Sequence, residues 1–228
     1  MKRRVTIIWM VQVALLSALA TVLYYFPKFP LPIFPSILKV QFSMLPTIIG
    51  GFALGPIGGI LICLIKFLFK LVTTHSAGIG EFTDLLIGVG VVTITTTVYK
   101  YNHTKRGAVG ALLSGVLFWC LIAIVLNGFF AMPQYVKLYG IDAVVGMLKV
   151  IPGVTEENYL FKYLIFGCLP FNLMLSIIVS IVTYFVYKRV SWLFEKMENL
   201  VKPKKQTEVA STEESPVEEE NSEEQKEE

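Results

Sequence analysis

The sequence predicts an all-α integral membrane protein with six transmembrane helices. Of its 228 residues, 54% are hydrophobic and 16% are charged, whereas a soluble domain has about 25% charged residues. The mean hydropathy is +0.65. Apolar residues gather in long runs, and roughly 20 such residues cross a bilayer core of ~30 Å. This composition excludes a soluble globular domain, a disulfide scaffold and a nucleic-acid-binding domain.

Charge divides the chain into two parts. Residues 1–200 hold 16 basic and seven acidic side chains, whereas residues 201–228 hold four basic and ten acidic ones. The second part is rich in Glu, Ser and Thr and lacks aromatic residues, so it cannot bury enough apolar surface to offset its ordering entropy. We therefore expect a membrane domain over 1–200 and a disordered acidic tail over 201–228. A partner-binding role for the tail stays open.

The first predicted helix covers residues 5–26, behind the basic start Lys2-Arg3-Arg4. Ala18-Leu19-Ala20 resembles a signal-peptide cleavage site, but the apolar run continues beyond it, which favours an uncleaved helix. Four prolines in residues 27–35 then exclude a helix, because each removes a backbone donor and restricts the preceding residue. This Pro-rich segment is apolar. We expect it to form an external loop that folds back over a cavity.

Five further helices are predicted, at about residues 42–54, 58–73, 80–99, 108–130 and 159–187. Gly55-Pro56 separates the first two, which are short and must tilt or lie half-buried. A loop over residues 132–158, which contains Pro133 and Pro152, precedes the last helix. Nine basic residues lie near the helix ends on the side of the termini and five on the other side. The positive-inside rule therefore places both termini in the cytoplasm of a cell-membrane protein.

Four ionisable side chains lie inside the predicted membrane region. Lys66 and Lys70 share one helix face, and Glu81 and Asp84 begin the next helix. A charge at a helix centre costs about 2.5–3.5 kcal/mol on insertion scales, so such residues are usually paired or functional. Pairing of the lysines with the carboxylates would offset the desolvation of both. The set is either a structural ion-pair cluster or the polar floor of an external ligand site.

Two amides, Asn127 and Asn172, interrupt apolar helices in their external halves. Single amides often bond only a neighbouring helix. Two amides beside an apolar loop and a carboxylate also suit recognition of a flat heteroaromatic molecule. Phe129, Tyr135 and Tyr139 are candidates to stack on it, although aromatic residues at this depth are also typical of an interfacial belt.

No catalytic residue, metal site or cofactor is predicted. Gly78-Ile79-Gly80 lacks the lysine–serine pair of a phosphate-binding loop. The cysteines and histidines lack the spacing of a metal site; they are Cys63, Cys120, Cys168, His75 and His103. Active transport by this chain would need an energy source in other subunits.

Ala14, Ser17, Ala18 and Thr21 form a small-residue strip on the first helix, within which Ala14 and Ala18 lie four residues apart. Small residues four positions apart let helix backbones approach closely. The pattern fits packing inside the bundle as well as docking of a partner helix.

Five segments together resemble a known family. In chain order they are Leu38–Pro46, Gly50–Pro56, Gly78–Gly88, Asn127–Tyr135 and Leu169–Asn172. Over about residues 8–190 the chain resembles the S components, the substrate-capturing subunits, of energy-coupling factor (ECF) vitamin transporters. It is most similar to the riboflavin-specific members.

The resemblance implies six helices with an externally open vitamin pocket beneath the first loop. It implies that Ala14 and Ala18 dock on a transmembrane coupling subunit driven by two ATPases, and that Asn127 and Asn172 contact the ligand. The candidate ligand-binding residues are therefore Asn127, Asn172, Asp84, Glu81, Lys39, Phe129 and Tyr135.

Two positions depart from the family pattern. Asp84 stands where the family usually has asparagine, and Leu175 stands where it usually has lysine. Relative to the family pattern, the pocket gains an acidic residue and loses a cation, which disfavours the binding of flavin phosphates. The leading hypothesis is a riboflavin-binding S component. The alternatives are an S component for another vitamin or heteroaromatic compound, a membrane enzyme using Lys66, Glu81 and Asp84, and a scaffold whose acidic tail recruits partners.

Overall fold

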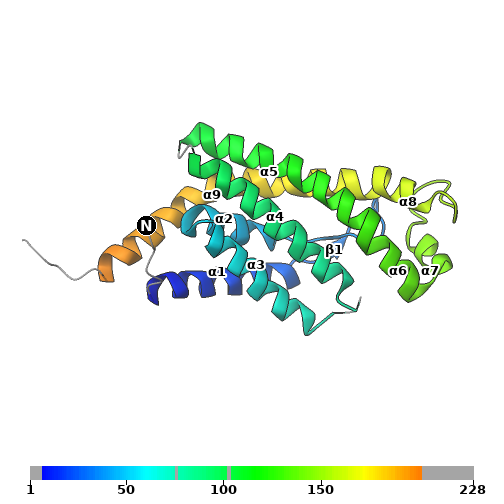
Figure 1. The fold of residues 1–228 in the computed structure, drawn as a ribbon, viewed down its shortest axis with the longest axis horizontal. Coiled ribbons are helices and arrows are strands. Elements are labelled where there is room, and N and C mark those ends of the chain that lie inside the picture. The colour runs from blue at the N-terminus through cyan, green and yellow to red at the C-terminus, as the bar shows by residue number, and fades with distance from the viewer. Residues whose placement is uncertain (1–6, 75–76, 102–103, 202–228) are drawn as a thin grey trace, which may run out of the picture.

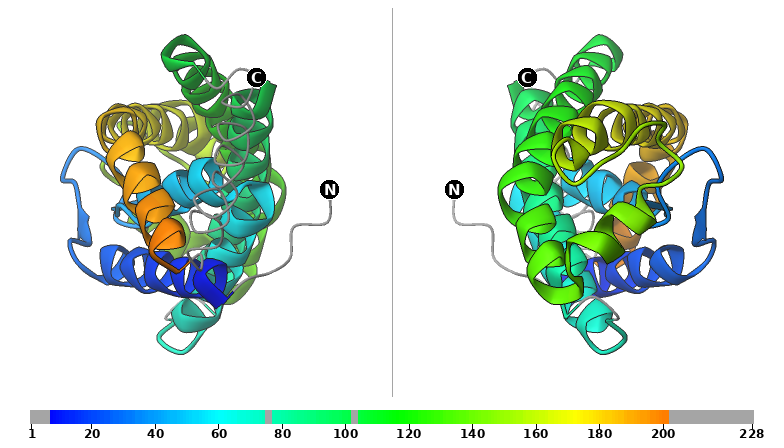
Figure 2. Two further views of the ribbon diagram at one scale, coloured as in Figure 1. Left: turned by 90° about the vertical axis from the view of Figure 1, so that its left-hand side faces the viewer. Right: turned by 90° about the vertical axis from the view of Figure 1, so that its right-hand side faces the viewer.

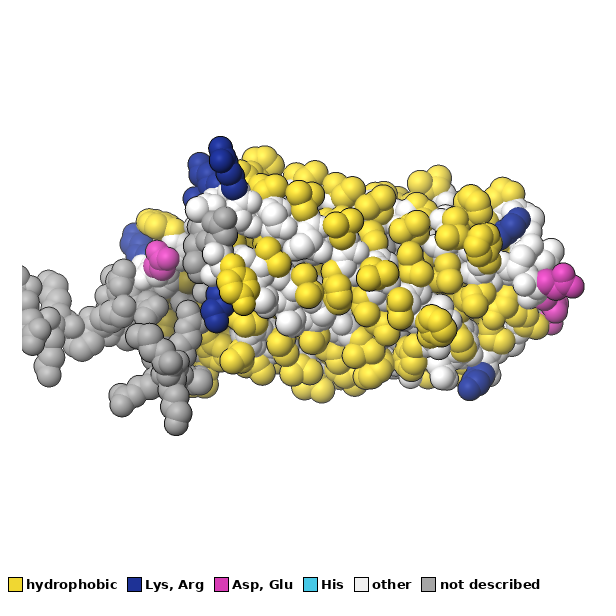
Figure 3. Space-filling view, turned by 45° about the horizontal axis from the view of Figure 1, so that its top comes forward, with side chains coloured by type: hydrophobic (Ala, Val, Ile, Leu, Met, Phe, Trp, Pro, Cys, Tyr) yellow, Lys and Arg dark blue, Asp and Glu magenta, His cyan; other side chains and the backbone are white. Residues whose placement is uncertain are grey.

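The computed structural model describes residues 7–74, 77–101 and 104–201, without the side chains of 198–201. Residues 202–228 of the predicted acidic tail and both histidines lie outside the described residues. The helices run mostly along one long axis (Figure 1). On the face drawn in Figure 3, apolar side chains cover the middle of the molecule and charged ones gather at its two ends. This distribution is that of a protein whose middle lies in a bilayer.

Four helices of the described chain are long and apolar enough to cross a membrane: Ile7–Tyr25, Ile79–Tyr101, Lys105–Tyr139 and Tyr159–Met197. The first is α1 (Ile7–Tyr25) and the second is α4 (Ile79–Tyr101). The third joins α5 (Lys105–Leu126), a π-helical turn η1 (Asn127–Ala131) and α6 (Met132–Tyr139). The fourth lies within α8 (Tyr159–Lys162), the π-helical turn η2 (Tyr163–Cys168) and α9 (Leu169–Val201). The expected helical membrane fold is confirmed at this level.

Two shorter helices, α2 (Met44–Leu54) and α3 (Pro56–Leu71), separate α1 from α4. Their break falls at Gly55-Pro56 as predicted: Gly55 has a φ of +83°, which favours glycine, and Pro56 starts α3, where its missing N–H is not needed. Eight of the 11 residues of α2 are buried, and α2 packs on α1, α3, α4 and α9. In the end-on views of Figure 2, α2 lies among the other helices. Protein thus covers most of this short helix.

Between α1 and α2 the chain forms no helix, as the four prolines of residues 27–35 predict. A short antiparallel hairpin pairs β1 (Phe29–Pro30) with β2 (Lys39–Val40), with Phe29 opposite Val40.

The predicted loop from 132 to 158 is partly wrong, because it contains α6 and α7 (Ile141–Met147). Pro133 does not stop the preceding helix. It lies in the first turn of α6, and the N–H of Met132 bonds to the carbonyl of Asn127 through the wider π turn.

The last helix also continues beyond its predicted end at 187, to Val201. Phe194 is 5% exposed and packs among Val13, Leu16 and Ala20 of α1. The Gln12 amide donates a 3.3 Å hydrogen bond to the Phe194 carbonyl. These contacts with α1 hold the extension against the bundle.

Candidate functional site

A cavity of about 390 Å³ is lined by residues at the end of the bundle where α1 ends and β1, α6 and η2 lie. Figure 1 shows these elements at the end away from the start of α1. Its wall is built from the end of α1, the 36–41 segment, α3, α4, the α5–η1–α6 helix and the η2–α9 helix. Six of the seven candidate ligand-binding residues line it: Lys39, Glu81, Asp84, Asn127, Tyr135 and Asn172.

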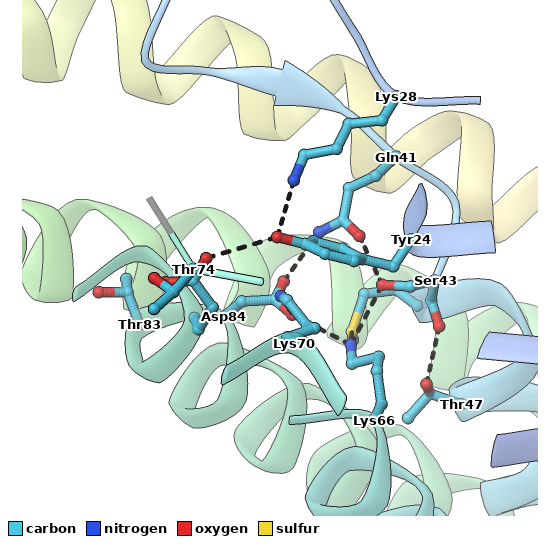
Figure 4. A network of polar contacts seen from close by, with 12 residues as sticks. Tyr24, Lys28, Gln41, Ser43, Thr47, Lys66, Lys70, Thr74, Thr83 and Asp84 are labelled. Carbon is cyan, nitrogen blue, oxygen red and sulfur yellow. Dashed lines mark hydrogen bonds and ion pairs between the residues drawn. The ribbon is translucent and has the colours of Figure 1, made fainter. Parts of the chain in front are cut away.

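One side of the cavity is charged, with Asp84 at its centre (Figure 4). Asp84 Oδ2 lies 2.7 Å from Lys70 Nζ and 3.1 Å from Lys66 Nζ. Asp84 Oδ1 accepts a 3.1 Å hydrogen bond from the Gln41 amide. Lys66 is 0% exposed and Lys70 is 2% exposed. The predicted pairing of the two lysines with a carboxylate is therefore confirmed at Asp84.

Glu81 makes different contacts. Its carboxylate accepts a 2.9 Å hydrogen bond from the Thr74 hydroxyl and a 3.5 Å one from the Tyr24 hydroxyl. The Tyr24 ring lies 4.1 Å from Lys70 Nζ and 3.9 Å from Lys28 Nζ, and Lys28 also donates to the Tyr24 hydroxyl. Partial desolvation and then repulsion from Lys39 lower the pKa of the Lys28 ammonium.

Sequence reasoning missed Tyr24, Lys28 and Gln41 as members of this site. Tyr24 is typical of an interfacial aromatic belt, and Lys28 enters only the count of basic residues. For Gln41 the one available signal was its place in the Leu38–Pro46 segment. All three line the cavity.

The two amides lie elsewhere on the wall, and the protein fixes the orientation of each. Asn127 donates to the Ala123 carbonyl at 2.8 Å and accepts from the Tyr163 hydroxyl at 2.8 Å. Asn172 donates to the Cys168 carbonyl at 2.8 Å and accepts from the Trp119 indole at 3.0 Å. A carboxamide oxygen has two lone pairs, so each amide can still accept a hydrogen bond from a ligand.

Aromatic rings accompany the amides. Tyr135 and Tyr139 line the cavity with their rings stacked, 6.2 Å apart and 19° from parallel. The expectation for Phe129 is not met: it is 85% exposed and does not line the cavity. Residues two apart on a helix do not share a face, so Phe129 points away when Asn127 points inward.

The predicted small-residue strip is divided in the structure: two of its members face outward and one is buried. Ala14 and Ala18 are exposed along α1, whereas Ser17 is buried between them. Packing inside this bundle therefore does not explain the pair.

The fold and the cavity define a helical membrane protein with a cavity of small-molecule size within its helix bundle. Residues 9–187 match the family model of the ECF transporter, substrate-specific component, and the chain belongs to this family. The family consists of transport components, so the hypothesis of a membrane enzyme using Lys66, Glu81 and Asp84 is wrong. Membership also favours transport over a scaffold role.

Several curated relatives cover most of the chain. The riboflavin transporter RibU of Staphylococcus aureus (strain TCH60) is 27% identical over 182 residues, which cover 80% of this chain and 89% of the relative. RibU of Lactococcus lactis subsp. cremoris (strain MG1363) is 31% identical over 190 residues, 76% of this chain and 88% of the relative. The riboflavin transporter FmnP of Bacillus subtilis (strain 168) is 26% identical over 181 residues, 78% of this chain and 89% of the relative.

A solved structure also resembles the chain. It is described as the S component of a bacterial ECF transporter and aligns with a TM-score of 0.62 at 26% identity. The alignment covers 85% of this chain and 97% of that chain. The resemblance noted in the sequence is thus confirmed.

Proposed function

We propose that this chain captures riboflavin in the cavity and delivers it as the substrate-specific subunit of an ECF importer. The observation that carries the proposal is the pair of oriented amides, Asn127 and Asn172, on a cavity wall shared with aromatic rings. The names of the relatives above support the choice of vitamin. A volume of about 390 Å³ falls within the range of about 300–1,000 Å³ common for small-molecule sites.

The flat isoalloxazine ring lies on the amide side, where Asn127 and Asn172 bond its polar edge and Tyr135 packs on its face. Aromatic side chains pack favourably on flat ring systems at centroid distances of about 4.5–7 Å. The flexible hydroxylated chain of riboflavin then extends toward Glu81, Asp84 and Lys39. Phe129 is left out of the proposed site because it faces away from the cavity.

The cavity opens to the outside of the cell, with six helices in the membrane and both termini in the cytoplasm. The excess of basic residues on the side of the termini supports this orientation. The Pro-rich segment after α1 lies over the external mouth, because Lys28 within it and Ser36 and Ile37 directly after it line the cavity.

Energy for uptake comes from partner subunits: a transmembrane coupling protein and two ATPases. The outward strip of Ala14 and Ala18 on α1 provides a surface for close helix docking on the coupling protein. The chain itself needs no cofactor for capture.

The proposal is tested by titrating the detergent-purified protein with riboflavin and measuring binding as quenching of flavin fluorescence. We expect saturable binding, and visible flavin absorbance in protein purified from cells supplied with riboflavin. A panel of other heteroaromatic vitamins runs in parallel. If the protein bound one of these vitamins and did not bind riboflavin, the proposed ligand would be wrong and the proposed role as an S component would stand.

A further inference from the structure

The charged side of the cavity is built as a balanced set of buried charges. Lys66, Lys70 and Glu81 are 0%, 2% and 7% exposed, and the Asp84 side chain is 19% exposed. These four groups carry two positive and two negative charges. The other cavity-lining lysines, Lys28 and Lys39, are exposed residues, so water screens their charges much more strongly.

Asp84 occupies the place that a ligand anion would need. Both of its close cations, Lys66 and Lys70, contact the same oxygen, Oδ2. Gln41 donates to the other oxygen, and Ser43 accepts a 3.2 Å hydrogen bond from Lys66 (Figure 4). Asp84 therefore already balances one of the two lysine charges from a position held on several sides, and Glu81 supplies the second negative charge of the set.

In the proposed binding mode, the hydroxylated end of the ligand faces this wall from within the cavity. A phosphate monoester carries about −1.5 to −2 charges at pH 7. Beside Asp84 and Glu81 it would lie next to like charges, or it would have to displace Asp84 and leave that carboxylate without its partners. Both arrangements are costly. Neutral hydroxyl groups avoid this cost, since they donate to carboxylate oxygens and accept from ammonium groups.

On the basis of the proposed function, we propose that Asp84 is the protein's own counter-ion for Lys66 and Lys70. In this role it restricts the cavity to ligands whose polar end is uncharged. Asp84 is thus a specificity-determining residue that admits a free polyol chain and excludes its phosphate ester. Within the described cavity wall, Asp84 is the acid in contact with both buried lysines.

The test compares riboflavin with riboflavin 5′-phosphate as probes on the full chain. We expect the wild type to bind riboflavin about tenfold or more tightly than the phosphate, because like charges brought together in a desolvated site cost several kcal/mol. In Asp84→Asn the lysine pair is released, and we expect this preference to fall by about tenfold or more. Asp142→Asn, an exposed acid on α7 outside the cavity lining, is the matched control and should keep the wild-type ratio.

A second variant covers the case in which Asp84→Asn does not fold with two uncompensated lysines. Asp84→Asn combined with Lys66→Gln keeps one buried lysine against Glu81 and still releases Lys70 from its carboxylate. Its preference for riboflavin should fall by about threefold or more. The inference would be overturned if the wild type bound the two probes with equal affinity. It would also be overturned if the ratio of the two affinities were unchanged in whichever variant folds. Either result would leave the proposed function standing. Absence of riboflavin binding by the wild type would overturn both.

Discussion

The hydroxyl of Tyr163 donates a 2.8 Å hydrogen bond to the side-chain oxygen of Asn127. Asn127 begins η1 and Tyr163 begins η2, so this bond joins the two π-helical turns at the cavity. Single π turns inside α-helices are often found at functional sites. Here both turns carry cavity-lining residues, and the bond fixes how Asn127 presents its amide.

Replacement of Tyr163 by phenylalanine tests that role. The ring stays, but Asn127 loses the donor that orients it. A neutral hydrogen bond contributes about 1 kcal/mol, so we expect riboflavin affinity to fall about fivefold. Fluorescence titration measures the change. Tyr184→Phe, outside the cavity lining on α9, is the control and should bind like the wild type; an unchanged affinity of Tyr163→Phe would show that Asn127 does not need this bond.

Asn172→Ala should weaken ligand binding more than it weakens folding. The variant leaves polar groups of the ligand unpaired at about 1–3 kcal/mol, a loss of roughly 5- to 150-fold in affinity. It also removes the acceptor of the Trp119 indole, which lowers stability. Trp119→Phe separates the two effects, because it changes the same contact from the other side. We expect that variant to lose thermal stability with a smaller loss of affinity, and similar affinity losses in both variants would remove Asn172 from the ligand contacts.

The sequence allowed prediction of the parts of the site that depend on nearby positions. Lys66, Lys70 and Asp84 lie on successive helices joined by a short turn, so their pairing follows from spacing and from the cost of burying charge. Asn127 and Asn172 are recognisable as polar side chains in apolar runs.

Other parts depend on the tertiary path of the chain. Gln41 reaches Asp84 only because the segment after α1 folds back over α3 and α4. Phe129 is an aromatic residue at the expected depth, but the helix turns its side chain outward. The continuation of the helix through Pro133 rests on a π turn, for which composition gives no signal.

Close packing of α2, α3 and α4 gives a prediction about stability. A Cβ added at Gly59 of α3 would lie 3.0 Å from the Gly51 Cα of α2 and would overlap Val92 of α4. Because one contact is to backbone, Gly59→Ala should lower the free energy of unfolding by about 1–3 kcal/mol. It should also lower the thermal unfolding temperature in detergent. At Gly110 of α5 nothing lies within 4 Å of an added Cβ. Gly110→Ala should hold or raise that temperature, and equal effects of the two variants would contradict the packing argument.

Deletion of Gln206–Glu228 should leave both riboflavin binding and uptake unchanged. The deleted residues are acidic and lack the apolar periodicity of a packed element. Cellular uptake of radiolabelled riboflavin, normalised to membrane abundance, is the measurement. A tail of the same composition in scrambled order serves as the control. Loss of uptake in the deletion and in the scrambled tail, at normal abundance, would show that the order of tail residues serves a specific partner.

The outward strip on α1 makes a prediction about coupling. Ala14 and Ala18 carry no polar group and do not line the cavity, yet they are exposed where a helix could approach closely. Replacing both with arginine adds bulk and charge to that surface. Riboflavin binding by the isolated subunit should survive, whereas co-purification with the coupling subunit and uptake should both be lost.

Arginine is costly on any lipid-facing helix, so this double variant needs a control of equal charge. Leu117 and Leu121 of α5 are also four residues apart, and they are 73% and 61% exposed. Leu117→Arg with Leu121→Arg imposes a similar insertion cost on another face and should keep assembly and uptake nearer to wild type. Loss of assembly in both double variants would trace the defect to membrane insertion. Loss of ligand binding with assembly intact in the α1 variant would show that the strip supports the cavity, and the docking assignment to Ala14 and Ala18 would then be wrong.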